Sequence, residues 1–412
     1  MLSGYTAVQV LVQGVAFASG VLLVRVMEQS DYGHYTLAIS MVGLANVLLD
    51  LGLATAVLAI GGPEHWNRKR LASLLGDAFR VQRTLLLGLL LLVPIFAFML
   101  HRQGLQPVQV FGLVLLVLAC AVFNVHNAIL VSVVRLRGDL ALQQKLEIGV
   151  ALGKLLLIIA ATAVYLDAQV AVGLNLLAAG ALFGMLRSRL TAQLGATARS
   201  IGTDVLALKS FIRRQAPNTL YYCFMGQITI WLIGILGNAD RLAEIGALGR
   251  LAAVFTVIGA VVGAVIQPYF ARQSLPRDLV SAFFTLNAFF TALTVALVAL
   301  AVLAPQALLW ILGARYSGLT VEVVWMVLAA SLSAWSGAAY AVGASRGWLV
   351  SAWVQIPFGL CAIAVSCWAF DVSSVAGCFM LNTSVAAVSL ALTLWMVTKH
   401  LLIATRSGET AA

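Results

Sequence analysis

Long runs of apolar residues constrain this chain more than any other feature. A helix that crosses the hydrocarbon core of a bilayer needs roughly 20 mostly apolar residues. Twelve runs of this kind lie near residues 5–26, 35–61, 84–101, 108–134, 146–166, 168–186, 216–237, 243–270, 279–304, 318–343, 348–369 and 372–398. The chain is 62% hydrophobic and only 10% charged, whereas soluble domains are about a quarter charged. The sequence therefore predicts an all-α integral membrane protein with about 12 transmembrane helices.

The 25 Lys and Arg residues are distributed unevenly between the loops. The loops that follow even-numbered runs, together with the C-terminal tail, hold 19 of the 25, whereas the alternate loops hold only Arg102, Arg241 and Arg315. Loops rich in Lys and Arg stay in the cytoplasm, so we expect both termini to be cytoplasmic. The net charge of +10 is on this interpretation an orientation signal, and we expect no nucleic-acid partner.

A basic connection divides the chain into two halves of six runs each. We expect an N-terminal six-helix bundle at 1–190, a cytoplasmic linker at 191–215, and a C-terminal six-helix bundle with a short cytoplasmic tail at 216–412. Within the linker, "DVLALKSFIRRQAP" predicts an amphipathic helix on the membrane surface, after which Pro217 opens the next span.

A similar entrance precedes the second run of each half. In "SDYGHYTLAIS" and "AEIGALGRLAA", an acidic residue, an apolar residue and a glycine lead into the hydrophobic segment. We expect Asp31 and Glu244 near the N-termini of their helices, where negative charge is favourable, and Gly33 and Gly246 in equivalent outer turns at the start of those spans. A repeat that keeps its orientation relates the two bundles by an axis along the membrane normal and predicts a central cavity between them.

Three pairs of glycines have the GxxxG spacing within predicted spans. This spacing allows close approach of neighbouring membrane helices. The pairs are Gly149 with Gly153, Gly180 with Gly184, and Gly259 with Gly263.

Three basic residues lie inside or at the rim of predicted spans. A charge at the bilayer centre costs at least about 2.5–3.5 kcal/mol, so it normally faces a cavity or a partner. By helical rise, Lys154 lies about 13 Å deep and Arg250 roughly 10 Å deep. Arg25, at the outer end of the first span, fits an interfacial anchor as well as a ligand contact. We take all three as candidate substrate-binding residues, with structural pairing as the alternative.

Other polar side chains inside the spans are further candidates. Asn124 and Asn127 share one face of the fourth span at i and i+3 and are candidate substrate contacts, although hydrogen bonding between helices also explains them. Asp50 in the second span is a buried acid, and Glu147 precedes Lys154 by seven residues, which is two turns along the same face. Both acids are candidates for coupling or gating, with structural roles as the alternative.

The sign of these charges favours an anionic ligand. A desolvated phosphate or diphosphate needs several cationic donors, whereas a cavity for cationic drugs would present acids and aromatic rings. The sequence contains no GxxxxGK[ST] segment that would bind ATP. We therefore expect no cofactor, and transport that is secondary or facilitated.

Several stretches resemble one known family. "LLVRVMEQSDYGHYTLAISMVGLANVLLDLGLATAV" resembles the opening of bacterial polysaccharide-biosynthesis flippases, the O-antigen and teichoic-acid exporter family. "GQITIWLIGILGNADRLAEIGALGRLAAVF", "LLWILGARYSGL" and "SRGWL" are similar to its second half. That family belongs to the multidrug/oligosaccharidyl-lipid/polysaccharide exporter superfamily. The resemblance implies translocation of undecaprenyl-diphosphate-linked oligosaccharide from the cytoplasmic to the outer leaflet of the bacterial inner membrane. It also implies a cationic cavity in which Arg25, Lys154 and Arg250 handle the diphosphate.

Two other functions remain open. One is a multidrug–cation antiporter of the same superfamily, which the sign of the cavity charge would distinguish. The other is a membrane-embedded polysaccharide polymerase or ligase, which would need a sizeable outer loop, whereas each outer loop here has about a dozen residues or fewer. We therefore expect a transporter rather than an enzyme, with the lipid-linked oligosaccharide, membrane lipid and a polysaccharide polymerase of the same pathway as partners.

Overall fold

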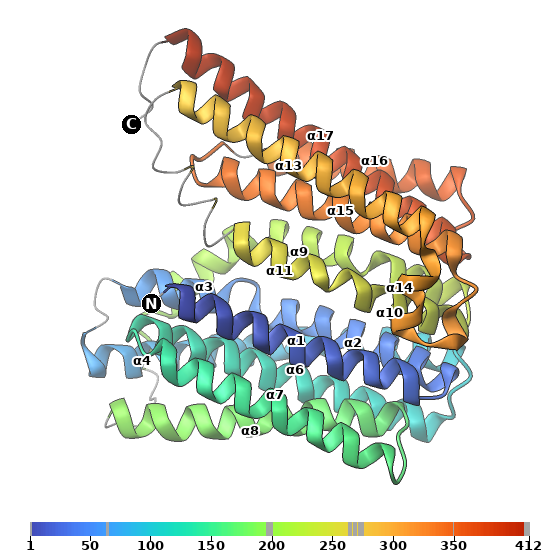
Figure 1. Ribbon diagram of the computed structural model, residues 1–412. Helices are drawn as coiled ribbons and strands as arrows, with labels where there is room; N and C mark the ends of the chain where they lie inside the picture. Colours follow the sequence, from blue (N-terminus) through green and yellow to red (C-terminus); the bar gives the residue numbers. More distant parts are fainter. Residues whose placement is uncertain are drawn as a thin grey trace. The chain divides into compact units, whose positions relative to one another are not determined.

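The computed structural model describes residues 2–62, 66–194, 201–262, 266, 270, 276–348 and 350–407, and the regular elements of these residues are all helices (Figure 1). The chain separates into two compact units, Met1–Ala243 and Glu244–Ala412. The boundary between them falls within one helix, α10. The division into two six-helix bundles with a linker at 191–215 stays a prediction.

The N-terminal unit contains α1 to α9 and the first part of α10. Their bounds are α1 (Leu2–Val26), α2 (Gln29–Asp50), α3 (Leu53–Gly61), α4 (Arg68–Leu89), α5 (Val93–Arg102), α6 (Pro107–Leu136), α7 (Leu140–Thr162), α8 (Ala168–Leu194), α9 (Val205–Leu236) and α10 (Ala239–Ala252).

The C-terminal unit contains the remaining elements. These are α11 (Val254–Val261), α13 (Pro276–Leu303), α14 (Pro305–Leu312), the 3₁₀ turn Ala314–Tyr316, α15 (Thr320–Ala344), α16 (Ala352–Ala369) and α17 (Val375–Ser407).

Each predicted run falls on one helix or on two consecutive helices, which confirms the all-α membrane fold class. Within the described ranges, eight helices or continuous pairs are long and apolar enough to span a bilayer, and the pair α4 and α5, bent by 47°, makes a ninth. The runs that do not qualify correspond to α1, α7, and α10 with α11. In α7 the reason is charge, because Lys145, Glu147 and Lys154 lie within 10 residues. The third of these runs is interrupted at Ala253, and α11 is only 8 residues long.

The second span is also interrupted, and a carboxylate stabilises the break. Leu51 and Gly52 have φ angles of 40° and 86°, a region that glycine enters without steric cost. The Asp50 carboxylate accepts hydrogen bonds from the backbone N–H of Gly52 at 3.2 Å and of Ala54 at 2.9 Å. Asp50 therefore caps the N-terminus of α3, where N–H groups lack helical partners.

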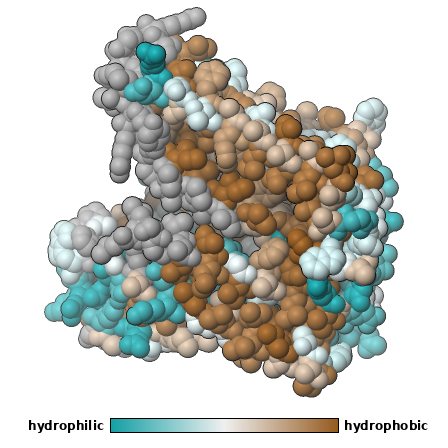
Figure 2. All heavy atoms as spheres, in the orientation of Figure 1, coloured by the Kyte–Doolittle hydropathy of each residue, from teal (hydrophilic) through white to brown (hydrophobic). Residues whose placement is uncertain are grey.

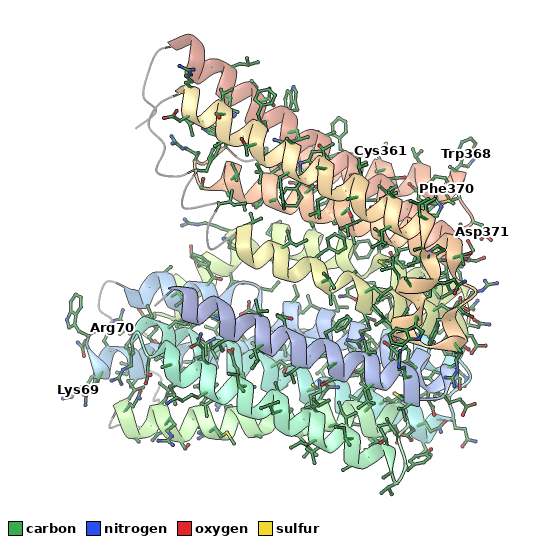
Figure 3. All side chains as sticks on the ribbon, viewed as in Figure 1. Lys69, Arg70, Cys361, Trp368, Phe370 and Asp371 are labelled. Carbon is green, nitrogen blue, oxygen red and sulfur yellow. The ribbon has the colours of Figure 1, made fainter. Side chains whose placement is uncertain are left out.

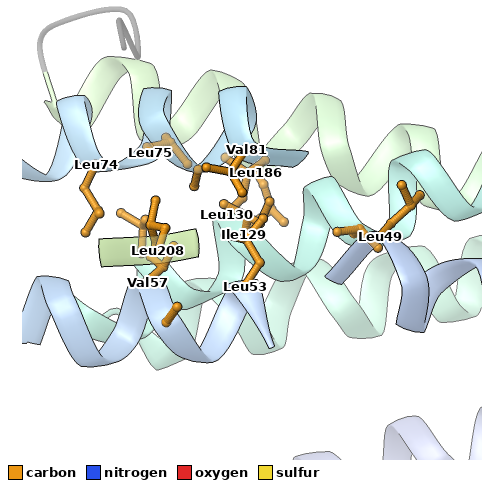
Figure 4. Close-up of a cluster of buried hydrophobic side chains, with 14 of the residues drawn as sticks. Leu49, Leu53, Val57, Leu74, Leu75, Val81, Ile129, Leu130, Leu186 and Leu208 are labelled. Atoms are coloured by element: carbon orange, nitrogen blue, oxygen red, sulfur yellow. The ribbon is translucent and has the colours of Figure 1, made fainter. Parts of the chain in front are cut away.

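A dry cluster of aliphatic side chains holds the N-terminal unit together at one end (Figure 4). It draws on α2, α3, α4, α6, α8 and α9, with fully buried members such as Leu49, Val57, Leu74 and Ile129. Lipid tails are as apolar as these side chains, so close packing rather than the hydrophobic effect stabilises such contacts within a bilayer.

Two charged residues of α4 anchor the start of α9. The fully buried Asp77 accepts hydrogen bonds from the backbone N–H of Gly202 at 2.8 Å and of Asp204 at 3.0 Å. Arg70 forms a two-pronged ion pair with Asp204, the residue that precedes α9. Such paired contacts fix geometry as well as adding energy.

Helix α9 corrects one expectation about the linker. It runs without interruption from Val205 to Leu236, with Pro217 inside it. The segment "DVLALKSFIRRQAP" is thus continuous with the following span rather than a separate surface helix ended by Pro217. Proline is tolerated inside membrane helices because neighbouring groups satisfy the freed backbone carbonyl.

The predicted GxxxG contacts are wrong where the structure describes them; Gly263, the partner of Gly259, lies outside the described residues. A Cβ added at Gly149, Gly153, Gly180, Gly184 or Gly259 would meet nothing within 4 Å. A close approach is found instead at Gly33, where a Cβ would lie 1.9 Å from the carbonyl oxygen of Ala239. Gly33 therefore packs on the backbone at the start of α10.

The two entrances differ at their helix starts. Asp31 lies in the first turn of α2, as expected. Helix α10 begins at Ala239, seven residues before Gly246, so its first-turn acid is Asp240 and Glu244 is its sixth residue. A sequence match of acid, apolar residue and glycine does not set where a helix begins.

In the C-terminal unit, α15 packs against α13 and α17, and α16 lies along α17 (Figure 1). Their shared core includes Phe283, Phe290, Val342 and Val397.

Exposed apolar side chains cover the sides of the helices, and polar residues gather near the helix ends (Figure 2). Trp368 of α16 is 89% exposed (Figure 3), as expected for a side chain that faces lipid.

Candidate functional site

Lys154 of α7 makes a polar contact with a neighbouring helix. Its ammonium donates a hydrogen bond to Oδ1 of Asn175 on α8. Both side chains are half-buried. The contact joins the charge at the middle of α7 to a neutral amide on the neighbouring helix.

Asn175 is itself held in place by two further hydrogen bonds. Its Nδ2 donates to the backbone carbonyl of Ala171, one turn earlier on α8, at 2.9 Å. The same group donates to the hydroxyl of Tyr35 on α2 at 3.4 Å, and Tyr35 is only 3% exposed. Because its amide donates to these two partners, the Asn175 carbonyl is oriented toward Lys154. We call Tyr35, Lys154 and Asn175 the Lys154 cluster.

Helix α6 adds two residues next to this cluster. The ammonium of Lys154 lies within electrostatic range of the buried Cys120 thiol. Asn124, one turn further along α6, donates a hydrogen bond to the Cys120 sulfur at 3.8 Å. The structure thus brings the predicted candidates Lys154 and Asn124 into one neighbourhood of the N-terminal unit.

The charge of Lys154 is not neutralised by an acid. In the part of the chain that the structure describes, Asn175 is its hydrogen-bond partner and no carboxylate forms an ion pair with it. An ammonium has three N–H donors and no acceptor, so two donors remain for a ligand. An anion would supply the missing compensation for a half-buried cation that has neutral neighbours.

Asn127 makes a separate contact, one turn along α6 from Asn124. Its Nδ2 donates to the backbone carbonyl of Ala179 on α8 at 2.9 Å, and its side chain is 6% exposed. The contact joins α6 to α8, as expected for a polar residue between membrane helices. Asn124 and Asn127 lie on one face of the unbroken helix α6, as their spacing predicts, but they bond to different partners.

The two acidic candidates make contacts that organise the backbone or the helix ends. Asp50 caps α3, as described above. Glu147 accepts a hydrogen bond from Nε2 of the buried Gln143 at 2.7 Å, and Gln143 accepts one from Nε of Arg135 at 3.2 Å. These bonds join the end of α6 to the start of α7, and none of them links Glu147 to Lys154.

The other two basic candidates lie at helix ends. Arg25 is exposed in the last turn of α1. Arg250 is half-buried in the last turn of α10, three residues before the break at Ala253. Arg250 belongs to the C-terminal unit, whereas Arg25 and Lys154 belong to the N-terminal unit.

The sequence reasoning missed Asn175 and Tyr35. Asn175 is an amide within the apolar stretch "VGLNLL" and Tyr35 follows the first entrance in "GHYT". Isolated polar residues within membrane spans normally face the protein interior, so this signal could have identified Asn175. The hydroxyl of Tyr35 carries no such signal, because tyrosines are common at membrane interfaces.

Acidic groups gather near the loop between α7 and α8. The Asp167 carboxylate raises the pKa of the exposed Tyr165 phenol above its usual range, with smaller contributions from Asp31 and Glu28. Negative charge disfavours ionisation of a phenol. This end of the N-terminal unit is acidic, whereas the opposite end of α2 leads to Arg68, Lys69 and Arg70 (Figure 3).

No family model and no curated protein matches the chain. Solved structures do. Lipid II flippase MurJ in an inward closed conformation has a TM-score of 0.72 at 10% sequence identity, over 97% of this chain and 89% of that one. An inward-facing multidrug resistance MATE family transporter of the MOP superfamily has a TM-score of 0.63 at 13% identity, over 95% of both chains. The eukaryotic MATE transporter AtDTX14 has a TM-score of 0.60 at 14% identity, over 98% and 97%. The chain therefore has the fold of these membrane transporters and of this flippase.

Proposed function

We propose that the chain is a flippase that moves an oligosaccharide linked to undecaprenyl diphosphate, such as an O-antigen repeat unit, from the cytoplasmic to the outer leaflet by alternating access. The observation that carries this proposal is that, among the residues the structure describes, Lys154 is compensated by a neutral amide and by no carboxylate. A site for a cationic drug would be expected to place a carboxylate there.

The likeness to transporters and to a lipid II flippase supports a transport function and not an enzymatic one. It does not choose between lipid-linked sugars and cationic drugs, because the structural neighbours include both kinds of protein. The electrostatics of the Lys154 cluster favour the lipid-linked sugar.

We assign Lys154 and Arg250 to binding of the diphosphate. Both are half-buried cations within helices, and a desolvated diphosphate requires more than one cationic donor. Arg25 is a third contact near the membrane surface, and Asn124 supports the site beside Cys120. The lipid chain stays in the bilayer, and a polysaccharide polymerase of the same pathway receives the product.

A transport assay distinguishes this function from multidrug–cation antiport. The purified protein is reconstituted into liposomes with a fluorescent undecaprenyl-diphosphate-linked sugar, and a membrane-impermeant quencher reports how much label has reached the outer leaflet. We expect faster translocation than in protein-free liposomes. Uptake of ethidium against a proton or Na⁺ gradient, measured in the same preparation, is expected to stay at the background rate. Ethidium transport without lipid translocation would establish the antiporter instead.

We propose that the protein lies in the inner membrane of a bacterium with both termini in the cytoplasm, because most of its basic residues fall in the loops on that side. In a cysteine-free variant, Tyr165→Cys and Lys69→Cys introduce single thiols at exposed positions. A membrane-impermeant maleimide added to spheroplasts is expected to label Tyr165→Cys and to spare Lys69→Cys. Both should react after the membrane is permeabilised. The reverse pattern in intact spheroplasts would invert the proposed topology.

A further inference from the structure

The C-terminal unit contains a groove that is lined almost wholly by apolar side chains. It encloses a cavity of about 440 Å³ between α13 and α17, with α15 as its floor. Phe284 and Leu402 form its exposed rim, and Phe283, Leu394 and Leu401 line its inner walls. The three helices that form it are all candidate membrane spans.

The polar groups of the wall are satisfied by one another. The indole N–H of Trp335 donates to Oδ1 of Asn287 at 2.8 Å, and Nδ2 of Asn287 donates to the backbone carbonyl of Phe283 at 2.7 Å. Thr398, the other polar residue of the lining, is exposed. Water in the groove would find few partners, and apolar cavities of this kind exclude water. Hydrocarbon is the filling that suits the walls.

The groove begins close to one end of its helices. Val280 is the fifth residue of α13 and Asn287 the twelfth, so the groove follows about 10 Å of that helix. On α17 it extends over the stretch from Leu394 to Leu402, near the C-terminal end of the helix. It therefore lies at the depth of the first part of a lipid chain, beside the headgroup region.

A cation lies where a headgroup would be. Arg277 is exposed in the first turn of α13. It precedes Val280 by three residues and Phe284 by seven, so it shares their face of the helix. Asp278 is the next residue, rotated by about 100° around the helix axis. Its position therefore lies on a different face of the helix from the groove. The groove thus joins an apolar trough to the positive charge of Arg277 at its membrane-surface end.

We propose that this groove binds one acyl chain of an anionic membrane phospholipid, with the phosphate of its headgroup beside Arg277. A phosphodiester carries one negative charge and matches one arginine. The diphosphate of a lipid-linked sugar needs several cations once desolvated, so the groove is a site for a resident lipid rather than for the transported one. The inference is independent of which substrate the protein transports.

Contact between the lipid chain and Trp335 provides the measurement. The protein is reconstituted in phosphatidylcholine liposomes that contain phosphatidylglycerol with brominated acyl chains, because bromine quenches the fluorescence of an adjacent indole. The Trp335→Phe variant identifies the share of the emission that Trp335 contributes. We expect this share to be quenched at low mole fractions of brominated phosphatidylglycerol. Brominated phosphatidylcholine should need a several-fold higher mole fraction.

Substitution of Arg277 tests the headgroup contact. Arg277→Gln is expected to raise the phosphatidylglycerol fraction needed for half-quenching of Trp335 by about fivefold, as removal of one basic residue near an anionic surface predicts. Lys209→Gln, at an exposed position on α9, is the matched control and should leave it unchanged. Equal quenching by the two lipids in the wild-type protein, or quenching that Arg277→Gln does not alter, would show that the groove holds bulk lipid and would overturn the proposal.

Discussion

Lys154→Gln is expected to reduce translocation of the lipid-linked sugar by about tenfold or more, because a charge-assisted contact to the diphosphate contributes on the order of 1.5–3 kcal/mol. Glutamine is one atom shorter than lysine, but it is also unbranched along its stem and its amide is a donor that faces Oδ1 of Asn175, the acceptor of the Lys154 ammonium. It removes a half-buried charge that no carboxylate compensates within the described residues. Folding is therefore expected to be unaffected, and initial flipping rates in liposomes, normalised to reconstituted protein, measure the change.

Related variants separate charge from position. Lys154→Arg should retain more activity than Lys154→Gln, since it keeps the charge. Arg250→Gln should impair transport as strongly as Lys154→Gln, and Arg25→Gln should be milder because that side chain is exposed. Asn175→Leu removes the carbonyl that accepts from Lys154, so its main effect should be weaker binding of the lipid-linked sugar. Full transport by the double variant Lys154→Gln, Arg250→Gln would rule out the diphosphate contact while leaving the transport function itself open.

Gly33→Ala is expected to destabilise the N-terminal unit severely. The new methyl group would lie 1.9 Å from the carbonyl oxygen and 2.7 Å from the carbonyl carbon of Ala239. Both are backbone atoms, so relief requires that α2 and the start of α10 move apart. Overpacking typically costs about 1–3 kcal/mol even where side chains can adjust. Thermal unfolding of the detergent-solubilised protein should show a lower midpoint, or the variant should fail to accumulate.

Gly149→Ala is the matched control for this substitution. Gly149 also lies within a helix, but a Cβ there meets nothing within 4 Å. Alanine is a better helix former than glycine by about 1 kcal/mol, so the variant should unfold at the wild-type temperature or above. A normal midpoint for Gly33→Ala would contradict the close approach between α2 and α10.

The membrane fold class and the approximate positions of the helices follow from local properties of the sequence. A run of apolar residues of the required length is sufficient to predict a span, whatever its neighbours are. Similar reasoning identified Lys154 as a residue of interest, because a charge within such a run needs compensation. The same runs did not reveal which helices are broken. The interruption after Asp50 depends on two positive φ angles and a carboxylate cap, and an aspartate in a span is equally compatible with a buried pair.

Only the tertiary structure shows which side chains contact a neighbouring helix. Spacing within α6 predicted a shared face for Asn124 and Asn127. It did not predict their partners, which are Cys120 on the same helix and the Ala179 carbonyl on α8. Spacing also marked glycine pairs for close contact, whereas the backbone approach occurs at Gly33.

By itself, the sequence determined that this is an all-helical membrane protein with a basic residue deep in its N-terminal half, because apolar run length and the cost of buried charge are properties of single segments. Only the tertiary structure decided that the neutral amide of Asn175 accepts from Lys154, that Asp50 serves a helix end, and that an apolar groove lies between α13 and α17. These features depend on the rotation of each helix and on which helix packs beside it. Residues far apart in the chain set both, and no periodicity within a single span encodes them.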